Sequence, residues 1–131
     1  MKTLKFLFTV VVIALLFGGC KYDFIVEEEI PVVDPEDPNA EQISFSSDIL
    51  PIFTTGNNCT SCHSTGKTAP DLTATKAYSA LISKYVNTTS PEQSKIYTVP
   101  KSDVSGHSQK KYTANQAALV LLWIQQGAKN N

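Results

Sequence analysis

The residues best suited to chemistry in this chain are Cys59-Thr60-Ser61-Cys62-His63. Two cysteines three positions apart on a tight turn can present both sulfurs to the two vinyl groups on one edge of a haem, forming thioether bonds. The histidine that directly follows then projects beneath the porphyrin ring, where its imidazole can meet the iron. The spacing therefore predicts one covalently bound haem c, attached through Cys59 and Cys62, with His63 as the proximal axial ligand of the iron.

Three other uses of a close cysteine pair compete with haem attachment. A zinc site could draw on Cys59, Cys62, His63 and His107, but the adjacent Cys62 and His63 would have to bind one ion, and the usual spacing of zinc-finger ligands is absent. A thioredoxin-like redox pair needs a strand before a helix, and no strand pattern precedes Cys59. A local structural disulfide is the third alternative. Haem attachment is favoured because it also explains the adjacent histidine.

The start of the chain predicts export and lipid attachment. Two lysines precede an apolar run over residues 6–17, which is too short to span a bilayer comfortably, and Gly18-Gly19-Cys20 follows. A cysteine after two small residues resembles the lipobox of bacterial lipoproteins, in which that cysteine becomes the acylated N-terminus. We expect residues 1–19 to be a cleaved signal peptide and Cys20 to be lipidated, with the chain anchored in the cell envelope, at the periplasmic face or the outer membrane. An ordinary secretory signal with a stray cysteine and an uncleaved anchor are the alternatives.

Charge divides the remaining chain into two parts. Between Cys20 and Glu41 many carboxylates accompany Lys21 alone, together with three prolines and no sustained periodicity. From Gln42 onward lysines outnumber acids, and the chain contains no arginine. We therefore predict a disordered, acidic linker over residues 20–42 and a single domain over 43–131. Nucleic acid is not expected as a partner, because an exported protein would not meet it and no aromatic-basic cluster occurs.

Helical periodicity predicts that the domain is all-α. The first three expected helices are a short one capped by Asp48 with Pro51 in its first turn, one over residues 76–86, and one that opens at a capping Ser90 and ends near Pro100.

The fourth expected helix is the most apolar. Thr113 and Gln116 form a capping-box pattern before it, and Gly127 is expected to end it. Its sequence is apolar around most of its circumference, which implies burial on more than one side. Fewer than 90 residues nevertheless make a thin core, and such domains commonly need a metal, disulfides or a cofactor. We expect the haem to fill that role.

From Ser44 to its end the chain resembles the class I mono-haem cytochrome c domain, in the variant found on bacterial envelope lipoproteins. Beside the Cys59–His63 pattern, the resemblance is carried by Asp48-Ile49-Leu50-Pro51-Ile52-Phe53, Ser90-Pro91-Glu92-Gln93-Ser94 and Trp123-Ile124-Gln125-Gln126-Gly127-Ala128. It implies a small helical domain wrapped around one haem. It also implies that the first and last helices cross near the haem edge, with Phe53 and Trp123 in that contact.

The second axial ligand departs from the family pattern. The resemblance implies a methionine from the loop before the last helix, but the only methionine is Met1, which is lost with the signal peptide. His107 lies in that loop, and a neutral imidazole is a good iron ligand. We expect His107 to be the distal ligand, giving bis-histidine coordination and a lower reduction potential than methionine would give. Water, lysine, tyrosine or an open position are the alternatives.

These patterns predict an electron carrier rather than an enzyme. A partly exposed haem edge near Lys67, Lys101, Lys110 and Lys111 could dock transiently against an acidic redox partner of the cell envelope. A haem enzyme or gas sensor with an open distal site, for instance a peroxidase-like one, is the first alternative and requires that His107 not bind iron. A haemless binding lipoprotein is the second.

Overall fold

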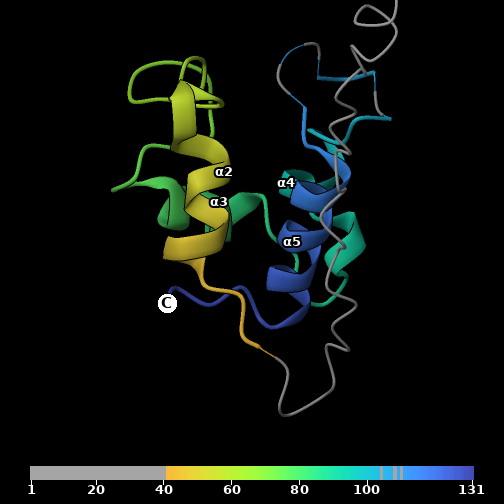
Figure 1. Cartoon of the computed structure of the whole chain (residues 1–131). Helices are drawn as coiled ribbons and strands as arrows, with labels where there is room; N and C mark the ends of the chain where they lie inside the picture. The colour runs from red at the N-terminus through yellow and green to blue at the C-terminus, as the bar shows by residue number, and fades with distance from the viewer. Residues whose placement is uncertain (1–40, 104, 108, 110) are drawn as a thin grey trace, which may run out of the picture.

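The computed structural model describes residues 41–131, apart from 104, 108 and 110. The described residues form helices and turns without any β-strand, so the all-α prediction is confirmed (Figure 1). The predicted signal peptide, Cys20 and almost all of the acidic linker lie outside the described residues. None of the helices in the described part of the chain has the length and apolarity that crossing a membrane requires. The elements are η1 (Phe45–Ile49), α2 (Leu50–Thr54), η2 (Thr55–Asn57), α3 (Ala77–Lys84), η3 (Pro91–Gln93), α4 (Lys95–Thr98) and α5 (Ala114–Gln125).

The first helical segment begins earlier than predicted. Ser44 is the N-cap of η1, because its side chain accepts a hydrogen bond from the Ser47 amide. The Asp48 carboxylate accepts a hydrogen bond of 2.7 Å from the Ser44 amide, inside the first turn. The prediction that Asp48 is the cap is therefore wrong, whereas Pro51 does occupy the first turn of α2, where its missing N–H is tolerated.

The helix predicted from Ser90 to Pro100 is broken in two. The Ser90 side chain makes no capping hydrogen bond, and the chain forms only the short η3 and α4. Between them, Ser94 adopts an extended backbone, with φ −60° and ψ 127°. Its buried hydroxyl accepts from the Asn87 amide and donates to the Asn87 carbonyl. These bonds to a preceding loop outweigh the local preference for a continuous helix.

Helix α3 is confirmed, with slightly shorter bounds than predicted, and α5 agrees with the sequence at both ends. The Thr113 hydroxyl accepts from the Gln116 amide while the Gln116 side chain accepts from the Thr113 amide, a complete capping box. At the other end Gly127 has φ +93°, a left-handed conformation that suits glycine, and helix α5 stops there.

The core is one apolar cluster to which η1, α2, α3, α4 and α5 all contribute buried residues. Phe45 sits between Tyr78 and Trp123, with ring centroids 5.2 and 5.4 Å away. Phe53 and Trp123, the pair implied by the family resemblance, are both fully buried in the same apolar cluster. The other large residues buried to this degree are Ile49, Leu81, Val120 and Ile124.

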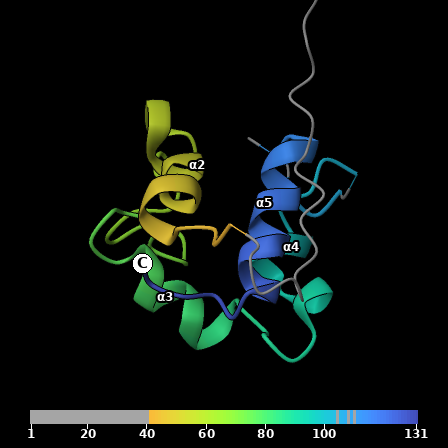
Figure 2. The same cartoon turned by 60° about the horizontal axis from the view of Figure 1, so that its bottom comes forward.

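The two ends of the described chain meet at one pole of the domain, which we call the terminal junction (residues 41–46 with 126–131). The Phe45 amide donates to Asn131 Oδ1, and the Ser46 amide donates to the Asn131 main-chain oxygen, both at 2.9 Å. The Ile43 amide donates to Gln126 Oε1 at 2.8 Å. Figure 1 shows this junction at the bottom of the view, while the segments around residues 60 and 105 lie at the top; Figure 2 brings the junction forward.

Candidate functional site

A turn after α2 carries the two cysteines and His63. The chain leaves the helix through Gly56 and Asn57, both with positive φ, and the Cys59 amide then donates to the Phe53 carbonyl at 2.9 Å. The amides of Cys62 and His63 both donate back to the Cys59 carbonyl, at 3.1 and 2.9 Å. This tight turn brings Cys59 and Cys62 to the same side of the chain, as their spacing predicted.

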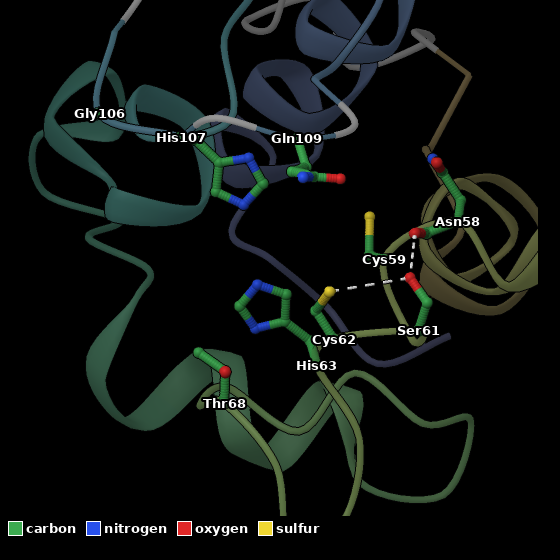
Figure 3. Close-up of a pocket in the computed structure, with 9 residues that line it drawn as sticks. All are labelled: Asn58, Cys59, Ser61, Cys62, His63, Thr68, Gly106, His107 and Gln109. Carbon is green, nitrogen blue, oxygen red and sulfur yellow. Dashed lines mark hydrogen bonds between the residues drawn. The ribbon is translucent and has the colours of Figure 1, made fainter.

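Both cysteines border a cavity of about 280 Å³, which we call the cysteine-side cavity. They are thiols, with no disulfide between them. Figure 3 shows the cavity between the cysteine turn and the loop that carries His107. Its lining comprises Asn58, Cys59, Ser61, Cys62, His63, Thr68, Gly106, His107 and Gln109.

The structure brings the rings of His63 and His107 opposite each other, although 44 positions separate the two residues in the sequence. Their ring centroids are 6.0 Å apart and their planes differ by only 16°. A nitrogen of each ring points toward the other ring (Figure 3). Two imidazoles bound to one metal ion from opposite sides have centroids about 6 Å apart, because each metal–nitrogen bond is about 2 Å long and each bound nitrogen lies about 1 Å from the centroid of its ring. The observed separation suits a single ion between the rings.

The same two histidines also border a second space, the apolar cavity, of about 130 Å³. The combined volume of the two cavities lies within the range of about 300–1,000 Å³ typical of pockets for small-molecule ligands. The histidine pair is common to both, so the combined space extends to either side of it. The apolar cavity is lined by His63, Ala69, Pro70, Leu72, Tyr85, Lys95, Ile96, Val99, Pro100, His107 and Tyr112.

Buried polar atoms without partners are concentrated at this site. Within the described part of the chain, only His63 Nδ1, His107 Nδ1 and Tyr112 Oη are buried and lack a hydrogen-bond partner. All three residues border the apolar cavity. Buried polar groups are almost always hydrogen-bonded, so the Tyr112 hydroxyl indicates a partner that the described residues do not supply, whereas the two Nδ1 atoms are the ring nitrogens turned away from the space between the histidines.

The environment of the two Nδ1 atoms shows whether hydrogen bonds fix the orientation of the histidine rings. Metal-bound histidines commonly donate the N–H of the second ring nitrogen to a carbonyl or carboxylate, which fixes the ring's orientation. No described residue accepts from either Nδ1 here. Packing alone therefore orients His63 and His107 in the described structure.

Tyr112 differs from the other tyrosines in its environment. Burial raises the pKa of its phenol well above the usual value of 10.0, and negative charge at Cys59 raises the pKa further. The hydroxyl is consequently protonated at neutral pH, and it is a potential hydrogen-bond donor on a residue that borders the apolar cavity.

The loop after His63 is pinned by Asp71. Its carboxylate accepts hydrogen bonds of 2.6 Å from the hydroxyls of both Thr65 and Thr73, and Lys76 lies 3.7 Å away. The bonds from Thr65 and Thr73, with a smaller contribution from Lys76, lower the pKa of Asp71 to about 2. Immediately after it, the Leu72 amide donates to the His63 carbonyl at 2.9 Å, so this loop is tied to the candidate ligand.

The donor set suits a haem better than a bare metal ion. No three histidine, cysteine or acidic side chains among the described residues are grouped so that they could hold a metal ion. An iron porphyrin needs only two ligands from the protein, because its own four nitrogens supply the rest. Two facing imidazoles, two thiols on one side and an adjoining apolar cavity satisfy these requirements.

The predicted lysines lie on the segments that border the cavities. Lys67 Nζ donates to the Ser61 carbonyl at 3.0 Å, beside the cysteines. Lys101 lies 5.0 Å from the centroid of the Tyr97 ring, and Lys111 Nζ donates to the Ser102 carbonyl at 3.3 Å. Lys110 lies outside the described residues.

Sequence reasoning missed Tyr112 and Lys95, which both border the apolar cavity. One signal for Tyr112 was present, because the residue before a helix N-cap is commonly a buried hydrophobe and Thr113 is that cap. Nothing in the sequence marked Lys95, since its place depends on the break in the chain at Ser94.

Comparison with known proteins does not add to this picture: no protein-family model, no curated protein and no solved structure matches the chain. The site's own geometry must therefore support any functional proposal.

Proposed function

We propose that this chain is a lipid-anchored c-type cytochrome that transfers single electrons in the cell envelope. One observation carries the proposal: His63 and His107 face each other at 6.0 Å beside a cavity that both cysteines of the Cys59–His63 pattern border. When bound, haem c would supply a reversible one-electron couple at its iron.

The chain's own residues divide the work of holding this group. Cys59 and Cys62 would fix one edge of the porphyrin through thioether bonds, which prevents loss of the haem outside the cytoplasm. His63 and His107 would bind the iron from opposite sides, leaving no open position for a substrate. The buried Leu72 and Ile96 would exclude water from the opposite edge. This arrangement favours electron transfer over peroxidase-like chemistry or gas sensing.

The remaining parts of the proposal concern location and partner. Acylation of Cys20 would anchor the protein in the envelope membrane, and the acidic residues between Cys20 and Glu41 would act as a tether. Lys67, Lys101 and Lys111, which lie on segments around the cavities, would favour a redox partner with an acidic docking site.

Mass spectrometry tests the proposal directly. The full chain would be produced in a bacterium that attaches haem c in its periplasm and then recovered from the membrane. We expect the mature chain to carry the added mass of one haem, and we expect sharp low-spin absorption bands after reduction. A mature chain without that mass would contradict the proposal and favour a haemless binding lipoprotein.

Replacing the distal histidine tests the coordination. His107→Ala should convert the haem from low-spin to high-spin and allow it to bind carbon monoxide, because the second imidazole is removed. Gln109→Ala is the matched control, since Gln109 lies in the same loop and borders the same cavity. Unchanged low-spin bands in His107→Ala would show that another residue holds the iron. Carbon monoxide binding by the unaltered protein would instead favour the enzyme or sensor.

A further inference from the structure

The Tyr112 hydroxyl is buried, unpartnered and not used by axial ligation or thioether attachment. The residue is 3 % exposed, and its Oη has no hydrogen-bond partner among the described residues. It borders the apolar cavity together with both histidines. A hydroxyl removed from water without a new partner is unfavourable, so this one points to an acceptor that enters the cavity.

Two sets of hydrogen bonds hold the backbone at Tyr112 in place. The Tyr112 amide donates to the Pro100 carbonyl at 2.9 Å, which closes the base of the loop that carries His107. The next residue, Thr113, caps α5 through the capping box. These bonds fix the position of the Tyr112 backbone, and the side chain is buried there, so a partner for its hydroxyl has to enter the cavity.

The lining of the apolar cavity favours an anionic partner. Most of the surrounding surface is apolar, including Leu72, Ile96 and Val99, while Lys95 is the lysine that borders the space. Tyr112 supplies a protonated phenol, and the exposed Lys95 carries an ammonium group at the border of the same cavity. Together they form a suitable pair of donors for a carboxylate.

The position of the cysteines indicates which carboxylate this is. Cys59 and Cys62 border the cysteine-side cavity only, whereas Tyr112 and Lys95 border the apolar cavity only, with the histidine pair common to both. A haem carries its two vinyl groups on one edge and its two propionate carboxylates on the opposite edge. Attachment at the cysteines would therefore direct the propionate edge toward the apolar cavity.

We propose that Tyr112 is a positioning residue whose hydroxyl donates a hydrogen bond to a haem propionate in the apolar cavity, with Lys95 as the neighbouring cation. This inference rests on the proposed haem function. It assigns to Tyr112 a contact with the edge of the haem that the thioether bonds leave unfixed.

The test uses the full-length haem protein and the variant Tyr112→Phe, which removes one oxygen and keeps the ring. We expect the haem mass and the low-spin bands to be unchanged, because the iron ligands and cysteines remain. The propionate bending mode in the resonance Raman spectrum should shift. The midpoint potential should fall, because a propionate without its donor holds more negative charge near the iron and favours the ferric state. Tyr97→Phe is the matched control, since Tyr97 borders neither cavity.

Each outcome separates this inference from the proposed function. A haem-bearing Tyr112→Phe variant with an unchanged Raman mode and potential would overturn the inference and leave the haem function standing. A rise in the midpoint potential would also overturn the inference. That result would indicate that the Tyr112 oxygen accepts a hydrogen bond from the N–H of an axial imidazole, because losing such a bond raises the potential. Equal shifts in Tyr97→Phe would show a general effect of tyrosine loss and overturn it as well. Unaltered protein without haem mass would overturn both.

Discussion

At the terminal junction, the amides of Ile43, Phe45 and Ser46 all find acceptors on Gln126 or Asn131, whereas the cavity end holds the three buried polar atoms for which the described residues supply no partner. Both regions belong to one small helical domain of the same chain. The junction is closed by its own side chains, whereas the cavity end keeps open space and buried polar atoms that the described residues do not partner.

This difference separates stability from function along the length of the domain. Residues at the junction should change the free energy of unfolding without changing the absorption spectrum. Residues at the cavity end should change what is bound, and the free energy of unfolding should change as a consequence of that loss.

The largest effect is expected from removing both attachment points. Cys59→Ala with Cys62→Ala should abolish covalent haem and prevent the holo-protein from accumulating, because the cavity end then lacks the group that completes its core. Intact-mass measurement and membrane-fraction yield check this outcome. Ser61→Ala, on the exposed residue between them, is the control and should retain haem. A double variant that folds as stably as the unaltered protein would show that the cavity end needs no bound group.

Next in size is truncation of the core beside the junction. Trp123 is 1 % exposed, and its Nε1 donates to the Lys129 carbonyl at 2.9 Å. Trp123→Ala should lower the free energy of unfolding by about 3–5 kcal/mol, the usual range for emptying a buried aromatic site. Denaturant titration of the haem protein measures it. Trp123→Phe should lose less, since most of the packing remains. A loss below about 1 kcal/mol for the alanine variant would contradict the position of Trp123 in the core.

A smaller effect is expected from opening the junction itself. Asn131→Ala removes the Oδ1 that accepts from the buried Phe45 amide, and it should lower the free energy of unfolding by about 1 kcal/mol. The absorption bands should not move. Asn130→Ala, at the exposed neighbouring residue, is the matched control and should have almost no effect on stability. Equal free energies of unfolding for Asn131→Ala and Asn130→Ala would show that the bond from the Phe45 amide to Asn131 does not stabilise the domain.

The smallest effect is the pH response of the loop after His63. The pKa of Asp71 is lowered from 3.8 to about 2 in the folded protein, so its ionised form is favoured by folding. The resulting stability is present above a pH of about 4 and is lost as the pH falls toward about 2. Unfolding measured across this window should show a steeper acid loss than in Asp71→Asn. Identical slopes in the two proteins would show that Asp71 does not hold this loop.

Features set by a few consecutive residues could be predicted from the sequence, and features set by contacts between distant residues could not. The capping box at Thr113 and the end of α5 at Gly127 depend on a few consecutive residues, and both were predicted correctly. The cap of the first helix was misplaced because Ser44 and Asp48 are both good capping residues; in the structure the Ser44 hydroxyl accepts from the Ser47 amide, and the Asp48 carboxylate accepts from the Ser44 amide. The continuous helix from Ser90 failed because Ser94 bonds to a residue seven positions earlier.

The candidate site divides in the same way. The turn that presents Cys59 and Cys62 is local, and the spacing predicted it. That His107 meets His63 was inferred from its loop and its chemistry, but its distance from His63 depends on the path of residues 101–112, which no short pattern determines. The unpartnered hydroxyl of Tyr112 is a property of the assembled domain, because only packing decides which polar atoms are cut off from water.

The place where the chain enters the domain has a mechanical consequence. Glu41 belongs to the terminal junction, where its carbonyl accepts from the Gln126 side-chain amide, and Figure 1 shows this junction at the bottom with the segments around residues 60 and 105 at the top. A flexible coil of about 20 residues averages about 25 Å end to end. If Cys20 is held in a bilayer, the domain is attached to the membrane through its terminal junction, and the cavity end points away from the membrane. The cavity end would then be accessible to partners above the membrane. Shortening the segment between Cys20 and Glu41 would reduce the distance that it can reach from the membrane and leave the midpoint potential unchanged.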